Sequence, residues 1–246
     1  TVYDRTSYEE SPLIAERIGD AEIVVMNKTP ISKTTLEKCP NVKMIAVLAT
    51  GFNVVDLAAA KERGIPVCNV PNYGGYSVSQ FAIALMLEAC LHIGHHDKTV
   101  HDGKWQNGDE WCYWDYPLIE LAGKTFGLLG CGRIGIHTAE AAKGLGMHVI
   151  AYDPFLKTAP NGIELVQDRM EIFREADFIS PHLNLTDDTF HSIGETEFKA
   201  MKPTACIINV SRGAIIDEPA LVRALQENEI GGAGLDVTDP EECALS

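Results

Sequence analysis

Short apolar runs alternate with helix-forming segments along the whole chain, and this alternation limits the fold more than any other feature of the sequence. The runs are rich in β-branched residues and lack the polar alternation of half-exposed strands, as in 23–26 and 44–48. Strands of this kind are typical of parallel sheets that are buried on both faces and joined by crossover helices. The pattern therefore predicts an α/β fold.

The alternation occurs twice, and the turn-forming sequence Asn72-Tyr73-Gly74-Gly75 separates the two series. In the first series we expect strands at 23–26, 44–48 and 67–70 and helices at 32–38 and 56–61. In the second series we expect strands at 125–129, 148–152, 177–180, 205–210 and 233–237, and helices at 134–145, 169–175, 195–201 and 218–228. A long apolar helix over 78–93 and a polar, Trp-rich, irregular stretch over 103–117 lie between them. Two series predict two domains, 1–73 and 74–246.

The charge balance and the cysteines restrict the partners and the compartment. The 246 residues include 20 Lys+Arg and 35 Asp+Glu, which gives a net charge of −15. Because an acidic surface repels phosphate backbones and anionic lipids, we expect neither nucleic acid nor a membrane as a partner. Apolar runs are shorter than the roughly 18 residues of a membrane span, and the seven cysteines form no C-x-x-C pair. These features predict a soluble cytoplasmic protein with reduced thiols.

The sequence Gly130-Cys131-Gly132-Arg133-Ile134-Gly135 fits the pattern G-x-G-x-x-G. It directly follows the apolar run 126–129 and opens an Ala-rich helix, which is the setting of a dinucleotide site. Gly130 would allow the tight turn, Gly132 the approach of a pyrophosphate, and Gly135 the packing of helix on strand. The helix N-terminus would face the anion. An ordinary strand-to-helix turn is the alternative.

Asp153 stands 18 residues beyond Gly135, at the end of the next expected strand. A carboxylate there accepts hydrogen bonds from the ribose hydroxyls and repels a 2′-phosphate, so it favours NAD over NADP. The alternative is a turn residue placed before Pro154.

Two further groups of polar residues follow later strands. They are Asn209-Val210-Ser211-Arg212-Gly213 and the acidic segment 236–242. Ligands of open α/β sheets bind at the carboxyl ends of the strands, and an arginine there offers a planar fork for a substrate carboxylate. Arg212 could equally be a solvated turn residue, and Glu241 could simply be exposed charge.

Taken together, these motifs resemble those of the D-isomer-specific 2-hydroxyacid dehydrogenases, and the resemblance covers essentially the whole chain. It rests on the segments 48–56, 64–67, 128–135, 182–189, 209–213 and 234–237. Within the family, 114–124 is similar to the glycerate dehydrogenase (hydroxypyruvate reductase) branch. The resemblance implies a Rossmann dinucleotide-binding domain plus a flavodoxin-like substrate domain. It also implies hydride transfer between NADH and a small 2-keto acid, for which hydroxypyruvate and D-glycerate are the best guess.

The resemblance also implies roles for individual residues. Arg212 would bind the substrate carboxylate and polarise the carbonyl, and Glu241 would pair with a histidine that protonates the keto oxygen. Ala49, Thr50 and Gly51 would hold the substrate from the other side. The NAD site would comprise Gly130, Gly132, Arg133, Ile134, Gly135, Asp153, Leu183, Thr189, Val210, Ser211 and Asp236. No metal site is predicted.

The chain departs from the family pattern at both ends. The family's acid is a histidine in a Pro-His element beyond the glutamate, whereas this chain stops five residues after Glu241. We therefore expect the catalytic histidine to be missing from this chain. The substrate domain would lack its first strand and its C-terminal return, and the NAD domain its last strand or strands. Pro181-His182 fits the H-x-P-L-T-x-x-T element instead, so we do not expect His182 to be the acid.

The sequence is also compatible with two other functions, and it predicts one assembly state. A phosphoglycerate dehydrogenase would need an extra basic residue in the first domain, where Lys28, Lys33, Lys43 and Arg63 are candidates. A non-catalytic, NAD-sensing binding protein of the corepressor kind would bind the coenzyme without turnover. The helix expected at 78–93 is apolar on most faces, and the family is typically dimeric, so we predict a homodimer.

Overall fold

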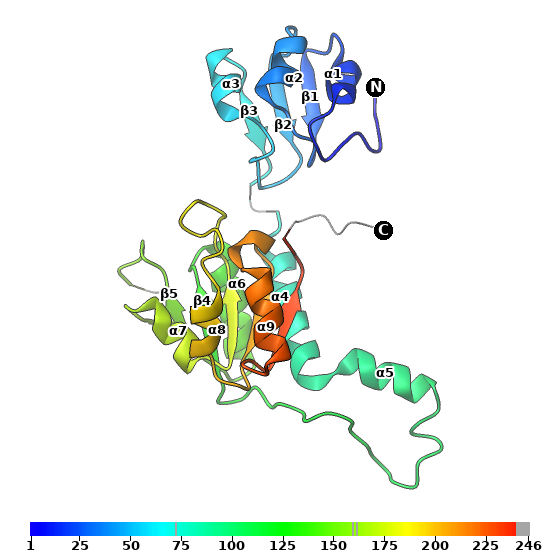
Figure 1. Ribbon diagram of the computed structural model, residues 1–246, viewed down its shortest axis with the longest axis vertical. Helices are drawn as coiled ribbons and strands as arrows, with labels where there is room; N and C mark the ends of the chain where they lie inside the picture. The colour runs from blue at the N-terminus through cyan, green and yellow to red at the C-terminus, as the bar shows by residue number, and fades with distance from the viewer. Residues whose placement is uncertain (72, 159, 161, 240–246) are drawn as a thin grey trace. The chain divides into compact units, whose positions relative to one another are not determined.

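The computed structural model describes residues 1–239 except 72, 159 and 161 (Figure 1). The chain forms two compact units, Thr1–Gly74 and Gly75–Ser246, which we call unit 1 and unit 2. Each unit contains a parallel sheet with helices packed against it. The α/β class predicted from the alternation of apolar runs is thus confirmed.

Unit 1 contains a three-stranded parallel sheet in the order β1-β2-β3, formed by Ile23–Met26, Met44–Val47 and Val67–Asn69. Its helices are α1 (Pro12–Ile18), α2 (Lys33–Lys38) and α3 (Leu57–Glu62). Each helix begins after a side chain that accepts a hydrogen bond from a backbone N–H of the first turn. These caps are Ser11, Ser32 and Asp56. Helix α1 is missing from the sequence prediction.

All three helices of unit 1 share one core with the sheet. This core includes Ile14 of α1, Leu36 of α2 and Ala59 of α3, together with Ile45 of β2. Helices α2 and α3 share a face because they connect successive strands, and right-handed crossovers that advance in one direction place their helices on the same side. On β1, Ile23 and Val25 are 60% and 59% exposed. The expectation that these strands are buried on both faces therefore does not hold for β1 among the described residues.

Unit 2 is built on a six-stranded parallel sheet in the order β6-β5-β4-β7-β8-β9. Two series of strands diverge from the neighbouring pair β4 and β7, which is the switch point where open α/β sheets bind ligands. The strands are β4 (Thr125–Leu129), β5 (His148–Tyr152), β6 (Glu164–Leu165), β7 (Phe178–Pro181), β8 (Cys206–Asn209) and β9 (Gly232–Leu235). The helices are α4 (Gly75–Leu91), α5 (Ile93–His101), α6 (Arg133–Gly144), α7 (Arg169–Glu175), α8 (Glu195–Ala200) and α9 (Glu218–Gln226), with a 3₁₀ turn η1 at Gly213–Ile215.

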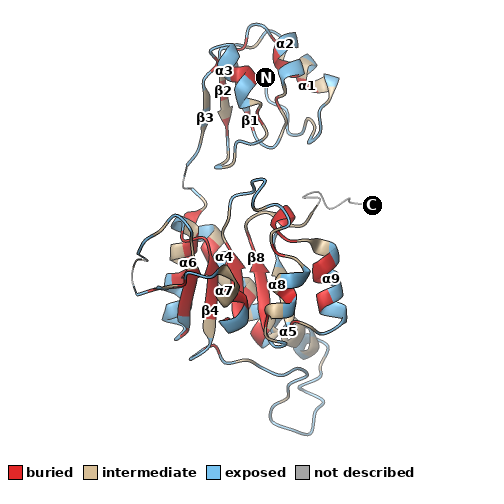
Figure 2. Ribbon diagram, turned by 60° about the vertical axis from the view of Figure 1, so that its left-hand side comes forward, coloured by how far each residue is buried: buried red, intermediate tan, exposed pale blue. Residues whose placement is uncertain are grey.

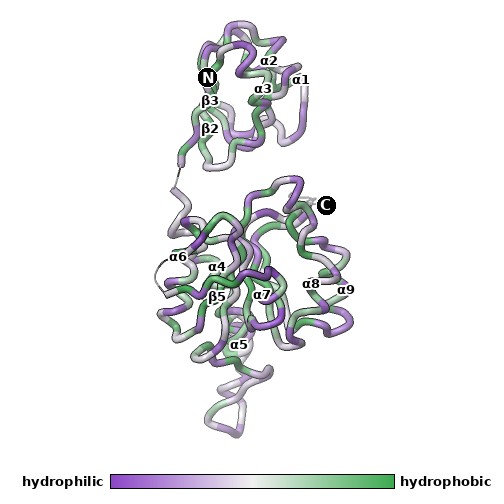
Figure 3. Tube along the Cα trace, turned by 90° about the vertical axis from the view of Figure 1, so that its left-hand side faces the viewer, coloured by the Kyte–Doolittle hydropathy of each residue, from purple (hydrophilic) through white to green (hydrophobic). Residues whose placement is uncertain are grey.

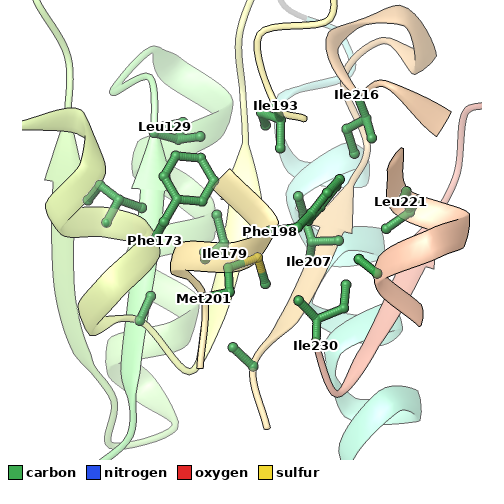
Figure 4. Close-up of a cluster of buried hydrophobic side chains, with 14 of the residues drawn as sticks. Leu129, Phe173, Ile179, Ile193, Phe198, Met201, Ile207, Ile216, Leu221 and Ile230 are labelled. Atoms are coloured by element: carbon green, nitrogen blue, oxygen red, sulfur yellow. The ribbon is translucent and has the colours of Figure 1, made fainter. Parts of the chain in front are cut away.

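Apolar side chains cover both faces of this sheet, so its central strands are buried (Figure 2). On one face, α7, α8 and α9 pack Phe173, Phe198 and Leu221 against Ile179 and Ile207 (Figure 4). On the other face, α4 and α6 pack against the alternate residues of the same strands. This burial on both faces explains why the strands of the second series are continuous apolar runs without polar alternation.

The segment after α4 differs from the sequence prediction. The chain leaves the helix at His92, which has a left-handed φ of 49°, and then forms α5 at an angle of 61° to α4. None of the residues of α5 is buried, and α5 with the loop beyond it extends away from the rest of unit 2 (Figure 1). Hydrophilic and hydrophobic residues are interspersed along this arm (Figure 3). In the described part of the chain, no single helix meets the length and apolarity of a membrane span; only the bent pair α4 and α5 does so together.

Candidate active site

The glycine-rich turn follows β4 and is shaped by close packing. Gly130 has a φ of +91°, and a Cβ atom there would lie 2.7 Å from the carbonyl oxygen of His182. A Cβ on Gly135 would overlap the carbonyl oxygen of Gly130. Both positions therefore require glycine, the first for its backbone conformation and both for space.

Gly132 is different, because packing does not demand it. Among the described residues, no heavy atom lies within 4 Å of the position of its Cβ. It caps the N-terminus of the twelve-residue helix α6, where no described side chain caps the helix. The first N–H groups of α6, beginning at Arg133 and Ile134, therefore have no side-chain cap, and the missing side chain at Gly132 leaves room for a pyrophosphate to approach the backbone. The turn fits a dinucleotide.

Asp153 lies directly after β5 and is joined to the turn. Its Oδ2 accepts a hydrogen bond from the backbone N–H of Cys131 at 2.8 Å, and its Oδ1 accepts one from Phe155 at 2.9 Å. Each carboxylate oxygen has a second lone pair, so both can still accept a ribose hydroxyl. Burial, and then the charge of Asp153, raise the pKa of the Cys131 thiol to about 11, which keeps this thiol neutral.

The loop after β7 contains His182, which adjoins the glycine-rich turn. Ser180 Oγ donates a hydrogen bond to the carbonyl oxygen of Ile208 at 3.0 Å, so it accepts one from His182 Nε2 at 3.1 Å. Burial lowers the pKa of His182 to about 4. The ring is therefore neutral near pH 7 and poorly suited to donate a proton to substrate, in line with the expectation that His182 is not the acid.

Two other residues of this loop were predicted to contact the coenzyme. Leu183 lies beside the turn, its Cδ2 3.1 Å from the position of a Cβ on Gly130. Thr189 Oγ1 donates to the carbonyl oxygen of Asn184 at 2.6 Å and accepts from the N–H of Thr186 at 2.8 Å. The Thr189 hydroxyl thus closes the turn over 184–189.

Arg212 lies on the loop between β8 and η1, and a buried asparagine orders this loop. Asn209 is 1% exposed. Its Oδ1 accepts from the N–H and the hydroxyl of Ser211 at 3.0 and 2.9 Å, and its Nδ2 donates to the carbonyl oxygen of Arg212 at 2.9 Å. Asn209 was part of the sequence motif but was given no role. Its role could have been predicted from its place at the end of a buried strand, because a buried side-chain amide needs hydrogen-bond partners.

The segment after β9 packs directly against the Arg212 loop. A Cβ on Gly213 would overlap the carbonyl oxygen of Thr238, so the two backbones touch. The N–H of Asp236 donates to the carbonyl oxygen of Asn209 at 2.9 Å, and the Asp236 residue is exposed. Val210 is buried. Glu241 lies outside the described residues.

The predicted substrate residues Ala49, Thr50 and Gly51 belong to unit 1, in the loop after β2. Thr50 Oγ1 donates to the carbonyl oxygen of Val70 at 3.1 Å, and Asn69 Nδ2 donates to that of Thr50 at 2.8 Å. The N–H of Val70 donates to the carbonyl oxygen of Ala49 at 3.0 Å. The loop is therefore fixed to the carboxyl end of β3.

Within unit 2, the candidate residues gather at one edge of the sheet. The turn after β4 touches the loop after β7 through Gly130 and His182, and the loop after β8 touches the segment after β9 through Gly213 and Thr238. The hydrogen bond from Ser180 of β7 to the carbonyl oxygen of Ile208 of β8 connects these two pairs of loops. The open helix N-terminus and Arg212 thus lie on loops at the carboxyl edge of the same sheet, as ligand sites in such sheets require.

Comparison with known proteins agrees with this geometry. Residues 83–245 match the family model described as "D-isomer specific 2-hydroxyacid dehydrogenase, NAD binding domain". A hydroxypyruvate reductase from Blautia hydrogenotrophica is 48% identical over 98% of this chain and 75% of its own length. A glycerate dehydrogenase from Methylorubrum extorquens is 41% identical over 93% of this chain and 71% of its own. A D-3-phosphoglycerate dehydrogenase from Methanocaldococcus jannaschii is 38% identical over 93% of this chain and 43% of its own.

Solved structures show the same likeness in three dimensions. The apo-structure of D-lactate dehydrogenase from Escherichia coli superimposes with a TM-score of 0.80 and 35% identity, over 92% of this chain and 72% of that one. The sequence relatives and the family model agree with this likeness over nearly the same residues. The chain therefore belongs to the family of D-isomer specific 2-hydroxyacid dehydrogenases.

Proposed function

We propose that this protein uses NADH to reduce a small 2-keto acid to the D-2-hydroxy acid, with hydroxypyruvate as substrate and D-glycerate as product. The observation that carries the proposal is that Arg212, on a loop ordered by Asn209, lies at the same sheet edge as the open N-terminus of α6. A cation and a dinucleotide site at one edge suit an anionic substrate beside a coenzyme. The names of the two relatives that are 48% and 41% identical support hydroxypyruvate as the keto acid.

Each of the candidate residues has a proposed role in the reaction. The nicotinamide coenzyme supplies the hydride when it is bound. Arg212 pairs with the substrate carboxylate and polarises the reacting carbonyl, as a guanidinium fork can. We also propose Ala49, Thr50 and Gly51 of unit 1 as substrate-binding residues. Glu241 would pair with a histidine acid that we do not assign to any of the eight histidines of residues 1–246, and it would raise the pKa of that histidine by favouring the imidazolium.

We further propose that the coenzyme is NAD rather than NADP. Asp153 Oδ2 and Oδ1 are held by Cys131 and Phe155, so the carboxylate cannot swing away from a ligand at the turn without losing two hydrogen bonds. Its negative charge opposes a 2′-phosphate and its free lone pairs accept ribose hydroxyls.

Phosphoglycerate dehydrogenase is the second candidate, supported by the relative that is 38% identical. Three of the four basic residues proposed for its phosphate already have partners. Lys33 pairs with Glu62, Lys43 pairs with Glu22, and Arg63 donates to the carbonyl oxygens of Cys39 and Pro40 at 3.2 and 3.0 Å. Lys28 is exposed just after β1 and is the remaining candidate.

A homodimer that involves α4 and α5 is part of the proposal. Large apolar side chains are exposed along α4, α5 and the following loop. They include Phe81, Ile93, Val100, Trp105, Trp111 and Trp114. A monomer rarely exposes so many together, so this surface suits a second copy of the chain. Sedimentation should give a dimer at micromolar concentration, and a monomer would contradict this part of the proposal.

We also place the protein in the cytoplasm. All six described cysteines are free, which suits a reducing compartment. Fractionation of the cells that produce the protein should recover it with the cytoplasmic enzymes. Recovery outside the cytoplasm would contradict this placement.

The function is tested by following the oxidation of NADH by the full-length protein. The substrates to compare are hydroxypyruvate, glyoxylate, pyruvate and phosphohydroxypyruvate, with NADPH as the second coenzyme. Hydroxypyruvate should give the highest kcat/KM. A preference for phosphohydroxypyruvate, abolished by K28A, would favour the second candidate. NADH binding without turnover of any keto acid would indicate the NAD-sensing alternative.

A further inference from the structure

Phe155 is the most exposed large apolar residue in the part of the chain that the structure describes. It is 92% exposed, whereas Phe52, Phe81 and Phe190 are 44%, 45% and 54% exposed. Exposure alone does not indicate a site, because single apolar side chains are common on protein surfaces. The place of Phe155 is the informative observation. It follows Asp153, the proposed partner of the adenosine ribose, by two residues.

The backbone around Phe155 is held in a turn. The N–H of Phe155 donates to Oδ1 of Asp153 at 2.9 Å, and the N–H of Leu156 donates to the carbonyl oxygen of Asp153 at 3.3 Å. Pro154, between them, has a restricted backbone. Leu156 is partly buried and packs against the apolar cluster that includes residues of α4 and α6. The turn therefore anchors Leu156 in the core and leaves the ring of Phe155 in water.

The carboxylate of Asp153 joins this turn to the glycine-rich turn. Its Oδ1 accepts the hydrogen bond from Phe155, and its Oδ2 accepts one from the N–H of Cys131 at 2.8 Å. In the sheet, β5 is a neighbour of β4, so the loops that follow these two strands lie beside each other. Phe155 therefore adjoins the proposed sites for the ribose and the pyrophosphate.

A ribose bound at Asp153 limits where its base can lie. The base is attached to the ribose carbon next to the one that carries the 2′-hydroxyl, so a hydroxyl held by the carboxylate brings adenine close to that carboxylate. Phe155 offers an exposed aromatic face at this place. Because adenine is flat and neutral, it can stack on such a face without a charged partner, which suits an acidic protein.

We propose that Phe155 binds the adenine ring of the coenzyme by stacking against it, while Asp153 binds the ribose of the same nucleoside. This inference rests on the proposed role of Asp153 at the coenzyme ribose. It extends the coenzyme site to a residue outside the glycine-rich motif. Phe155 contributes to the affinity for the adenosine half of the coenzyme and touches no reacting atom.

The test measures the Kd of NADH and of ADP for variants of the full-length protein by titration calorimetry. ADP carries the adenosine half of the coenzyme without the nicotinamide. F155A removes the ring, F155L keeps a large apolar side chain without an aromatic face, and F155W keeps an aromatic face. All three keep the backbone N–H that donates to Asp153. Y8A, at an exposed aromatic residue of unit 1, is the control.

F155A should raise the Kd of ADP and that of NADH by the same factor, about 10- to 100-fold, which is the usual effect of removing a ring that stacks on a base. F155L should fall between F155A and the wild type, and F155W should stay within about threefold of the wild type. The Tm should change by no more than about 2 degrees, because the ring is exposed. In phenylalanine-labelled protein, NOEs should connect the adenine protons of bound ADP to one phenylalanine ring and vanish in F155L.

A Kd of ADP in F155A within about twofold of the wild-type value would overturn the inference, because a stacked base contributes more than this. Equal losses in F155L and F155W would overturn it too, since they would mean that the variants disturb the turn and not a stack. Failure of the wild-type protein to bind ADP would have the same meaning. If the wild-type protein reduced no keto acid, the proposed function would fail, and the Kd of ADP would still decide the role of Phe155.

Discussion

The backbone N–H of Cys131 donates a 2.8 Å hydrogen bond to the carboxylate of Asp153, so the glycine-rich turn and the end of β5 form one structure. This relationship means that the residue proposed to select the coenzyme also shapes the turn that would bind it. Altering Asp153 should therefore affect both affinity and selectivity.

D153A should raise the KM for NADH about 10- to 100-fold, because hydrogen bonds to a charged group contribute about 1.5–3 kcal/mol each. The KM for NADPH should rise less, since the carboxylate that repels a 2′-phosphate is gone. Steady-state kinetics with both coenzymes measure the two changes, and D20A, at an exposed position of unit 1, is the control. An unchanged ratio of the two kcat/KM values would show that Asp153 does not select the coenzyme.

R212A should lower kcat/KM for the keto acid at least 100-fold, which corresponds to about 3 kcal/mol for a charge-assisted contact. The Kd of NADH should stay within a small factor, because Arg212 is proposed to meet the substrate. R223A on α9, whose side chain is 3.8 Å from Glu195, is a suitable arginine control. Arg212 would lose its proposed role if R212A kept full kcat/KM.

N209A should lower both stability and activity although Arg212 is unchanged. It removes the partners of the Ser211 N–H and the Arg212 carbonyl oxygen, and leaving a buried group unpaired costs about 1–3 kcal/mol. Urea unfolding measures the first effect and kcat/KM the second. N209D retains the acceptor for Ser211 but not the donor for Arg212, so it should separate the two bonds. Full activity in both variants would show that the loop needs neither bond.

Acid should destabilise the protein partly through His182. Burial lowers the pKa of His182 to about 4 from an ordinary value of 6.5. Below about pH 6.5 the imidazole of His182 therefore binds a proton in the unfolded chain, whereas in the folded protein it binds one only near pH 4. The stability linked to the neutral ring is present above pH 6.5 and is lost as the pH falls towards 4, by up to about 3 kcal/mol. Urea unfolding at pH 7, 5.5 and 4 should show a smaller loss in H182Q, and parallel losses would contradict this origin.

The sequence predicts five of the six described strands of unit 2 closely, because burial of the central strands on both faces leaves continuous apolar runs. It misses β6, a two-residue strand with no buried residue. It misses α5, whose residues are exposed and whose composition resembles that of the polar stretch after it. Helix α1 was missed as well, because it precedes the first expected strand and the alternation of strands and helices does not predict it. The exposure of Ile23 could not be predicted from the sequence, because a strand with an exposed apolar face and a strand buried on both faces have the same run of apolar residues.

The candidate site was predictable where a motif has a local physical cause. Gly130 and Gly135 are required by turn conformation and packing, and Asp153 by its place after a strand. The contact between His191 and Asp239 was not predictable, because the two residues are 48 positions apart along the chain. Contacts of that kind arise only when parallel strands bring their loops to one edge.

The separate cores of the two units affect how the protein responds to heat. Unit 1 encloses a small core and leaves Ile23 and Val25 in contact with water, whereas unit 2 has apolar clusters on both faces of its sheet. Units with independent cores need not melt as one cooperative system. We expect unit 1 to melt first, taking with it the loop of Thr50. On heating, the protein would then lose its affinity for the keto acid while it still bound the dinucleotide.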